Sequence, residues 1–224
     1  MKKPSLIIAL ILLISSFSLT MVGCRNVGGI EFGEYIYTGG QIFVQVTNNY
    51  RTARSFSMFI NFYDGDTIFH SEVVNDNTRP DSLILNGRET RVWAPLVGVR
   101  SSYYERATHV TFHAENIVPA PRAIRNIAFS DITFCEENSR ERISVQVTNN
   151  QGILLSGITF VVIAYDSNGT MVAGAVGGIL SAFGFFDAGE TMTFVARSHD
   201  DVELFENNDI VIYVMHIVEA QSWD

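Results

Sequence analysis

Apolar and polar residues alternate with a period of two along most of the chain that follows residue 40. Ile143, Val145 and Val147, for example, are separated by polar residues, as in a β-strand with one face on a core and the other near water. Residues 56–63 keep this alternation but carry apolar side chains on both faces, which favours a central strand. Beyond the first two dozen residues, no long stretch has the 3.6-residue spacing of an amphipathic helix. The pattern therefore predicts an all-β protein.

Residues that form tight turns separate the predicted strands at short intervals. Asn and Gly tolerate the positive φ angles that such turns need, and regular turns between short strands are typical of β-sandwiches and barrels. The turn sequences are Asn48-Asn49, Asp64-Gly65-Asp66, Asn86-Gly87, Asn149-Asn150, Ser167-Asn168-Gly169 and Ala188-Gly189. We therefore expect immunoglobulin-like β-sandwiches.

One segment of the sequence occurs twice. Residues 44–49, Val-Gln-Val-Thr-Asn-Asn, recur letter for letter at 145–150, an offset of 101 residues. Further matches keep the same order: 56–64 aligns with 158–166, Gly87-Arg88-Glu89-Thr90 with Gly189-Glu190-Thr191, and 110–112 with 211–213. The order and spacing of these matches indicate a duplication. Because a period of about 100 residues is the size of a small domain, we predict two tandem β-sandwich domains.

The boundary between the two copies is predicted at Val118-Pro119-Ala120-Pro121. Its two prolines lack the N–H that a strand ladder needs and favour an extended linker. The first β-sandwich repeat, with its N-terminal tether, is then residues 24–121, and the second is residues 122–224. Since each copy would close its own core, we expect residues 122–224 to fold alone as a β-rich monomer.

The second copy resembles a known family of domains. It has a Thr-Asn-Asn turn at 148–150, a strand ending in Tyr-Asp at 165–166 and Gly-Glu-Thr at 189–191, and in these it resembles the FxLYD-type β-sandwich domains of bacterial extracellular lipoproteins. The resemblance covers residues 140–218 well and 40–118 more weakly, and Ala164 and Phe62 stand where the family has Leu before Tyr-Asp. It implies a fold and a cell-envelope setting, and it brings no catalytic residues.

The first 23 residues have the parts of an export signal peptide. Two lysines precede an uncharged stretch rich in Ile, Leu and Phe, which ends at the small residue Gly23. Residues 21–24, Met-Val-Gly-Cys, resemble the bacterial lipoprotein box with Met in place of the usual Leu, which implies a signal peptide of residues 1–23 and lipidation of Cys24. The alternative is an uncleaved signal anchor, since residues 4–24 are about long enough to span a bilayer. Both readings tether the chain to the cell membrane on its extracytoplasmic face.

The charge balance and the cysteines narrow the choice of partners. The formal net charge of −9 becomes −11 once Lys2 and Lys3 are removed with the signal. Nucleic-acid binding needs clustered Lys and Arg, so we expect no nucleic acid as a partner. With Cys24 lipidated, Cys135 has no disulfide partner. It lies in an apolar run, where we expect a small buried hydrophobe rather than a reactive thiol.

No pattern in the sequence predicts catalysis. The five histidines have no zinc-ligand spacing, and His109 and His113 would lie about 13 Å apart on one face of a strand. The acidic groups at 64–66 and 200–203 are candidates for calcium, but Asp and Gly are expected in the first for reasons of turn geometry alone. We predict no metal site, no cofactor and no enzymatic activity.

The sixteen residues 171–186 include no charged residue, whereas their counterpart in the first copy, 68–85, contains His70, Glu72, Asp76, Arg79 and Asp81. One interpretation is a buried strand and loop of the second sandwich. The other is a contact surface for an envelope protein partner or for the lipid surface. The partner-binding residues would then be Ile179, Leu180, Phe185 and Phe186.

These observations predict a lipid-anchored, extracytoplasmic binding or structural module of the bacterial cell envelope. The alternative is an accessory or sensor lipoprotein that captures a small molecule between its two domains, where ligand clefts commonly form. A rigid linker beside an apolar groove between the domains would favour that alternative.

Overall fold

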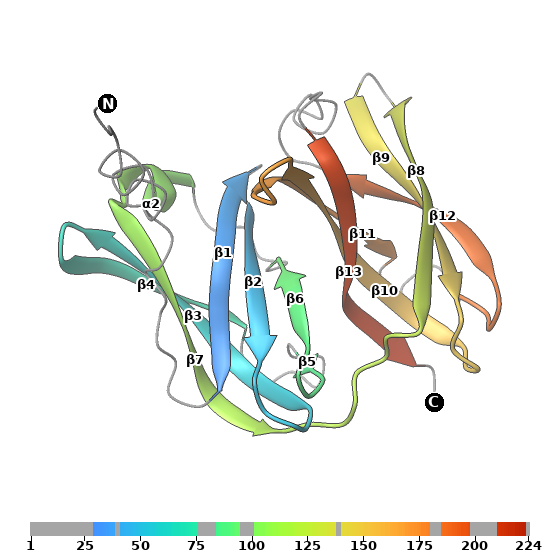
Figure 1. Cartoon of the computed structure of the whole chain (residues 1–224), viewed down its shortest axis with the longest axis horizontal. Coiled ribbons are helices and arrows are strands. Elements are labelled where there is room, and N and C mark those ends of the chain that lie inside the picture. The colour runs from blue at the N-terminus through green and yellow to red at the C-terminus, as the bar shows by residue number, and fades with distance from the viewer. Residues whose placement is uncertain are drawn as a thin grey trace, which may run out of the picture.

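A computed structural model describes residues 29–38, 41–75, 84–94, 101–137, 140–179, 185–197 and 210–222. Within these ranges the protein consists of antiparallel β-strands and one short helix, so the prediction of an all-β fold is confirmed. Figure 1 shows the strands in two groups, an N-terminal half of residues 30–119 and a C-terminal half of residues 127–222, joined by an extended connection.

The N-terminal half contains two antiparallel sheets. Strands β1 (Ile30–Thr38), β2 (Gln41–Asn48) and β6 (Thr90–Trp93) form the first, in the order β1-β2-β6. In the second, the long strand β3 (Arg54–Asp64) pairs with β4 (Thr67–Asn75), β5 (Ile84–Leu85) and β7 (His109–Pro119). Helix α2 (Ser101–Arg106) precedes β7 and packs Tyr103 and Tyr104 against the core.

The C-terminal half repeats this pairing order. Strands β8 (Ile127–Glu137), β9 (Arg140–Asn149) and β12 (Thr191–Arg197) pair as β1, β2 and β6 do. Strand β10 (Leu155–Asp166) pairs with β11 (Met171–Ile179) and β13 (Ile210–Ser222), as β3 does with β4 and β7. Here, however, β11 also pairs with β12 through two residues of each strand, which joins all six strands into one continuous sheet.

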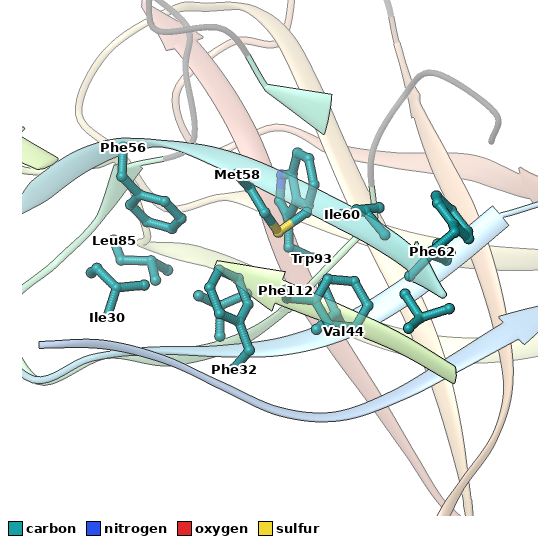
Figure 2. Close-up of a cluster of buried hydrophobic side chains, with 13 residues drawn as sticks. Ile30, Phe32, Val44, Phe56, Met58, Ile60, Phe62, Leu85, Trp93 and Phe112 are labelled. Atoms are coloured by element: carbon teal, nitrogen blue, oxygen red, sulfur yellow. The ribbon is translucent and has the colours of Figure 1, made fainter. Parts of the chain in front are cut away.

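Each half has its own cluster of buried hydrophobic side chains. In the first, alternate residues of β3 are fully buried, and Figure 2 shows them packed against side chains from the neighbouring strands. In the second, Ile143, Val145 and Val147 of β9 are fully buried, so the alternation read from the sequence is confirmed for this strand. Burying one large apolar side chain contributes roughly 1.5–3 kcal/mol, and clusters of this kind hold the strands together.

The repeated Thr-Asn-Asn motif has a structural role that is identical in the two halves. Asn48 and Asn149 are fully buried. The Asn48 Nδ2 lies 2.9 to 3.0 Å from the carbonyl oxygens of residues 52, 85 and 86, and the Asn149 Nδ2 makes the same three contacts with residues 153, 186 and 187. Each side-chain oxygen accepts a hydrogen bond from the backbone N–H two residues later. A buried amide must have its hydrogen bonds satisfied, so these positions require Asn.

The Tyr-Asp motif of the second copy also shapes a turn. The Asp166 Oδ1 accepts hydrogen bonds from the backbone N–H groups of Asn168 and Thr170 at 2.9 and 2.8 Å. The bond from Thr170 is the main cause that lowers the pKa of Asp166 below its usual value, with further bonds from Asn168 and Gly169. Gly169 has a φ of 79°, which suits glycine. The motif therefore sets the turn between β10 and β11.

Candidate functional site

The predicted site residues fall in different parts of the structure. Cys24 and Leu180 lie outside the described residues, and so does the acidic group at 200–203. Ile179 is the last residue of β11, and its side chain is not among those described. The prediction that Cys24 is lipidated therefore rests on the sequence.

The two phenylalanines of the proposed contact surface differ in exposure. Phe186 is 2% exposed, and its ring lies 5.8 Å from that of Phe194 within the second core. Its backbone also pairs with Leu155 in an isolated bridge. Phe186 is therefore a core residue and is not accessible to a partner. Phe185 is 53% exposed and lies on the surface.

The uncharged strand β11 has two buried faces. Ala173 and Ala175 face the core of the C-terminal half. Met171 and Gly174 instead face the N-terminal half, where Met171 is 2% exposed and Gly174 lies under the ring of Phe43. A charged side chain on either face would be buried without a partner, at a cost of several kcal/mol. This double burial explains why these four positions carry no charge, whereas it does not apply to Val172, which is 38% exposed.

The two halves are joined by a third hydrophobic cluster. Its buried members are Phe43, Val92 and Ala94 from the N-terminal half and Val161, Ile163 and Met171 from the C-terminal half. In this cluster the outer face of the β1-β2-β6 sheet packs against the outer face of strands β10 and β11. The equivalent positions of the other copy carry mostly different residues: Ser144 corresponds to Phe43, Thr193 to Val92 and Asn61 to Ile163.

A polar contact lies at the edge of this interface. The Glu34 carboxylate accepts a hydrogen bond of 2.8 Å from the backbone N–H of Met171. Burial and, to a smaller extent, the negative charge of Glu34 raise the pKa of Tyr165 above its usual value. The phenol of Tyr165 therefore stays neutral at the interface.

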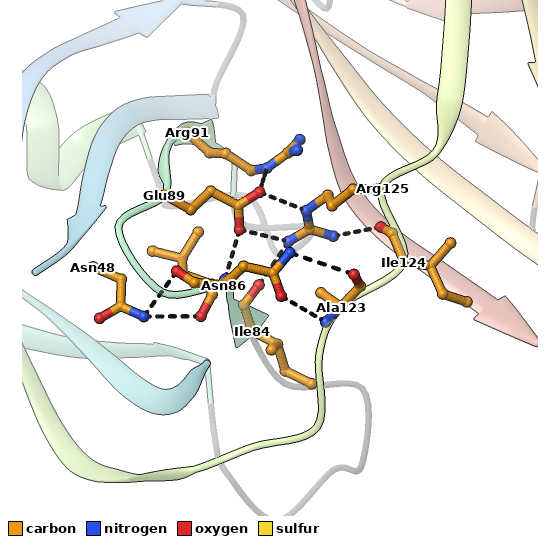
Figure 3. Close-up of polar contacts among 9 residues, drawn as sticks. Asn48, Ile84, Asn86, Glu89, Arg91, Ala123, Ile124 and Arg125 are labelled. Carbon is orange, nitrogen blue, oxygen red and sulfur yellow. Dashed lines mark hydrogen bonds and ion pairs between the residues drawn. The ribbon is translucent and has the colours of Figure 1, made fainter. Parts of the chain in front are cut away.

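The segment that joins the halves is bound to the N-terminal half by a charged network (Figure 3). The Glu89 carboxylate accepts hydrogen bonds from Arg91 Nε at 2.6 Å, from Arg125 Nε at 2.9 Å and from the backbone N–H of Asn86 at 2.7 Å. Arg125 also donates to the Ile84 carbonyl at 2.7 Å. All three charged side chains are at most 17% exposed.

The pKa values of this network reflect its burial and its opposite charges. Burial raises the pKa of Glu89, but the hydrogen bonds and charges of Arg125 and Arg91 outweigh it, so that the pKa of Glu89 lies below its usual value. Burial, together with the charge of Arg91, lowers the pKa of Arg125, while Glu89 raises it. A guanidinium remains charged at neutral pH, so the three residues form a charged triad.

The linker is also held through its backbone. The Asn86 Oδ1 accepts a hydrogen bond of 2.9 Å from the backbone N–H of Ala123, and the Ala120 N–H donates to the Ala53 carbonyl at 3.2 Å. Residues up to Arg125 thus contact the N-terminal half, beyond the boundary that the two prolines suggest. Sequence reasoning missed this because Arg125 lies 36 residues from Glu89.

The outer face of the β4-β3-β7 sheet carries a second group of side chains that the sequence did not single out. Tyr63 stacks on His109 with ring centroids 4.2 Å apart, and Phe59 stacks on His113 at 5.0 Å. Asn61 lies between these two pairs along β3 and opposes Thr111 of β7 and Ser71 of β4. The only available signal was the alternation of β3, in which Phe59, Asn61 and Tyr63 share one face.

Partly buried tyrosines of helix α2 and strand β1 pack together. Tyr104 stacks on Tyr37 with centroids 4.0 Å apart. Burial is the main cause that raises the pKa of Tyr104 far above its usual value, and interactions with Tyr35 and Tyr37 add to it. Such a phenol stays protonated at neutral pH, so it serves as a packing group and not as a base.

Among the described residues, no group of three or more His, Cys, Asp or Glu side chains is placed to hold a metal ion. Asp64 of the first acidic group instead pairs with Arg106 at 3.4 Å. In the same ranges, no helix has the length and apolar character needed to cross a bilayer.

The chain was also compared with known proteins. No protein-family model matches it, and no curated protein matches it at a significant level.

Proposed function

We propose that the protein is a lipid-anchored, extracytoplasmic binding or structural module of the bacterial cell envelope, without catalytic activity. The observation that carries the proposal is the lipoprotein-box sequence that ends at Cys24, placed before two β-rich halves with the same pairing order. Lipidation at that residue would hold both halves near the membrane surface, because stable anchoring follows from the burial of two or more acyl chains.

The architecture proposed for this module is two tandem immunoglobulin-like β-sandwich domains of the FxLYD type, residues 24–121 and 122–224. Three observations support it: the pairing order recurs, each half has its own hydrophobic cluster, and the Asn48 hydrogen bonds recur at Asn149. A duplicated domain of about 100 residues accounts for all three.

The contacts between the halves support a rigid module over capture of a small molecule between two domains. The linker is bound through Arg125 and Ala123, as the capture alternative would expect. The apolar surfaces between the halves, however, pack against each other: Phe43 and Gly174 touch directly, and Ile163 is fully buried. A cleft that opens and closes would require these buried groups to separate. A fixed pair of domains instead presents its outer sheet faces in a constant arrangement, as a binding or spacing element needs.

Metabolic labelling tests the anchoring. Bacteria that express either the wild-type chain or Cys24→Ser are grown with a labelled fatty acid. The protein is then isolated and its mass is measured by mass spectrometry. We expect label on the wild type in the membrane fraction, and an unlabelled protein with the mass of the precursor for the variant. Cys135→Ser is the matched control and should be labelled like the wild type. Equal labelling of the wild type and Cys24→Ser would refute the proposal.

A further inference from the structure

We infer that the outer face of the β4-β3-β7 sheet binds a neutral glycan. This inference rests on the proposed function and deepens it, because it names the class of ligand for the binding module. The face is defined here by Phe59, Asn61 and Tyr63 of β3, Ser71 of β4, and His109, Thr111 and His113 of β7.

The composition of this face is the first argument. Its two aromatic rings each stack on an imidazole, and Ile68 and Val73 of the edge strand β4 are 48% and 51% exposed beside them. The remaining members are uncharged groups that donate or accept hydrogen bonds. None of the seven residues that define the face is Asp, Glu, Lys or Arg, and the charged Glu115 lies at its margin, beside His113. A solvated strand face would ordinarily carry Lys, Arg and Glu.

The second argument is that the polar groups are held in place. The Ser71 hydroxyl donates to the Asn61 Oδ1 at 2.7 Å, and the Asn61 Nδ2 lies 3.4 Å from the His113 Nδ1. The His113 Nε2 lies 3.4 Å from a carboxylate oxygen of Glu115. In the tautomer in which the His113 Nδ1 accepts from Asn61, each group in this chain donates to the next across three strands. Binding then costs little side-chain ordering.

A neutral glycan matches this chemistry best. A sugar ring has an apolar C–H face that packs on aromatic rings, and hydroxyls that pair with amides, imidazoles and threonines. Phe59 and Tyr63 are four residues apart on one strand, which separates them by about 13 Å and suits an oligosaccharide rather than one sugar. The face offers no cluster of Lys and Arg for a phosphate-rich polymer, and its polar centre does not suit a lipid surface.

The equivalent face of the C-terminal half is not exposed but forms the contact between the two halves. There, Val161, Ile163 and Met171 pack against the N-terminal half. The face of the N-terminal half has Phe59 and Asn61 where β10 has Val161 and Ile163. Asn61 lies at the centre of the face. If a second copy of this chain docked on it, the Asn61 amide would be buried against apolar groups, which argues against self-association. Asn61, where the other half has Ile163, suits a polar ligand.

Binding is measured on the full chain, purified in a detergent without a sugar headgroup. Oligomers of N-acetylglucosamine, of glucose and of mannose are titrated separately by calorimetry and by saturation-transfer NMR. We expect at least one to bind, with affinity reduced about tenfold or more by Tyr63→Ala and by Asn61→Ala. Thr193→Ala, on an exposed sheet position of the C-terminal half, is the control and should bind like the wild type. Ser71→Ala is a second variant at an exposed position, and should weaken binding without lowering the melting temperature.

Three results would overturn the inference. One is the absence of binding by all three oligomers up to about 10 mM, where even weak complexes form. Another is binding that Tyr63→Ala, Asn61→Ala and Ser71→Ala leave unchanged. The third is concentration-dependent self-association that Tyr63→Ala abolishes, which would assign the face to a second copy. Acylation of Cys24 is read by labelling, so failure of anchoring and failure of glycan binding are distinguishable.

Discussion

The ring of Phe43 lies directly against Gly174, so closely that a Cβ atom at Gly174 would come within 2.7 Å of three ring atoms. Phe43 belongs to β2 of the N-terminal half and Gly174 to β11 of the C-terminal half, and Phe43 is 1% exposed. The residue equivalent to Phe43 in the second copy is Ser144. The contact between the halves therefore depends on a residue that the repeated segments do not share.

The first prediction is a double-mutant cycle on this contact. Phe43→Ser removes a buried ring and should lower the free energy of unfolding by about 3 kcal/mol or more. Gly174→Ala should cost about 1–3 kcal/mol because its methyl group meets the ring. In the double variant the serine leaves room for the methyl group, so the cost should be less than the sum of the two. Urea unfolding monitored by circular dichroism measures all three.

The control for this cycle is Gly152→Ala, since nothing lies within 4 Å of a Cβ atom at Gly152. We expect its free energy of unfolding to stay within about 0.5 kcal/mol of the wild type. Strict additivity of Phe43→Ser and Gly174→Ala would contradict direct packing of the ring on the glycine.

The second prediction concerns residues 122–224 expressed alone. The fragment should fold with a β-rich spectrum, because its hydrophobic cluster is its own. The sequence alone predicts a monomer, but the structure leads us to expect self-association, because Val161, Ile163 and Met171 lose the surface that buries them in the whole chain. Ile163→Asn, which copies the sister residue Asn61, should reduce that association. Analytical ultracentrifugation checks the outcome, and a monomeric wild-type fragment would contradict it.

Much of the fold could be predicted from the sequence because its signals are local or exactly repeated. The alternation at 143–147 and the hexapeptide ending in Asn48 and Asn49 indicate strands and a duplication without any knowledge of contacts. The pairing of β11 with β12 could not be predicted, because it joins only two residues of each strand. The alignment of 87–90 with 189–191 sets four residues against three and leaves the partner of Gly189 open. The structure pairs Gly189 with Arg88, because both have a positive φ and both precede the glutamate whose carbonyl accepts from the repeated Asn.

The surfaces were harder to predict than the strands. An uncharged run such as 171–179 predicts burial, but not which surface covers it, so a partner protein and the same chain's other half were indistinguishable. Likewise, Asn61 and His113 are 52 residues apart, and only the register of β3 with β7 brings them together. Candidate sites that arise from strand pairing of this kind leave little trace in a single sequence.

The third prediction concerns the acid sensitivity of the Glu89 triad. Glu89→Gln keeps an acceptor for the Asn86 N–H but removes the charge, and should lower the free energy of unfolding by about 1–2 kcal/mol at pH 7. The pKa of Glu89 is lower in the folded protein than the ordinary value of 4.5. Its ionised form therefore stabilises the fold fully above that ordinary value, and the contribution is lost as the pH falls through the folded pKa.

The matched control for the triad is Glu190→Gln. Glu190 accepts the same turn hydrogen bond, from the Asp187 N–H at 2.8 Å, but Met192 occupies the position equivalent to Arg91. Glu190→Gln should change the free energy of unfolding by no more than about 0.5 kcal/mol. Urea unfolding between neutral pH and the acid range measures both variants. A difference between wild type and Glu89→Gln that grows as the pH falls would contradict the assigned role.

The fourth prediction uses the turn before β6 and its counterpart before β12. Arg88 has a φ of 62° and Gly189 a φ of 79°, and their N–H groups donate to the carbonyls of Tyr50 and Asn149. The left-handed region costs a residue with a side chain about 1 kcal/mol or more, and glycine almost nothing. The same turn thus contains a strained residue, Arg88, in the N-terminal half and an unstrained one, Gly189, in the C-terminal half.

Exchanging these residues should therefore move stability in opposite directions. Arg88→Gly relieves the strain but increases the freedom of the unfolded chain, so we expect a net gain of about 0.5–1 kcal/mol. Gly189→Arg should cost about 1 kcal/mol or more, although nothing lies within 4 Å of a Cβ atom at Gly189, because the backbone angle alone opposes the substitution. Arg88 is exposed, so its removal leaves the core intact. Thermal and urea unfolding of the two variants check the signs, and a loss of stability in Arg88→Gly would mean that the arginine side chain contributes more than its backbone strain costs.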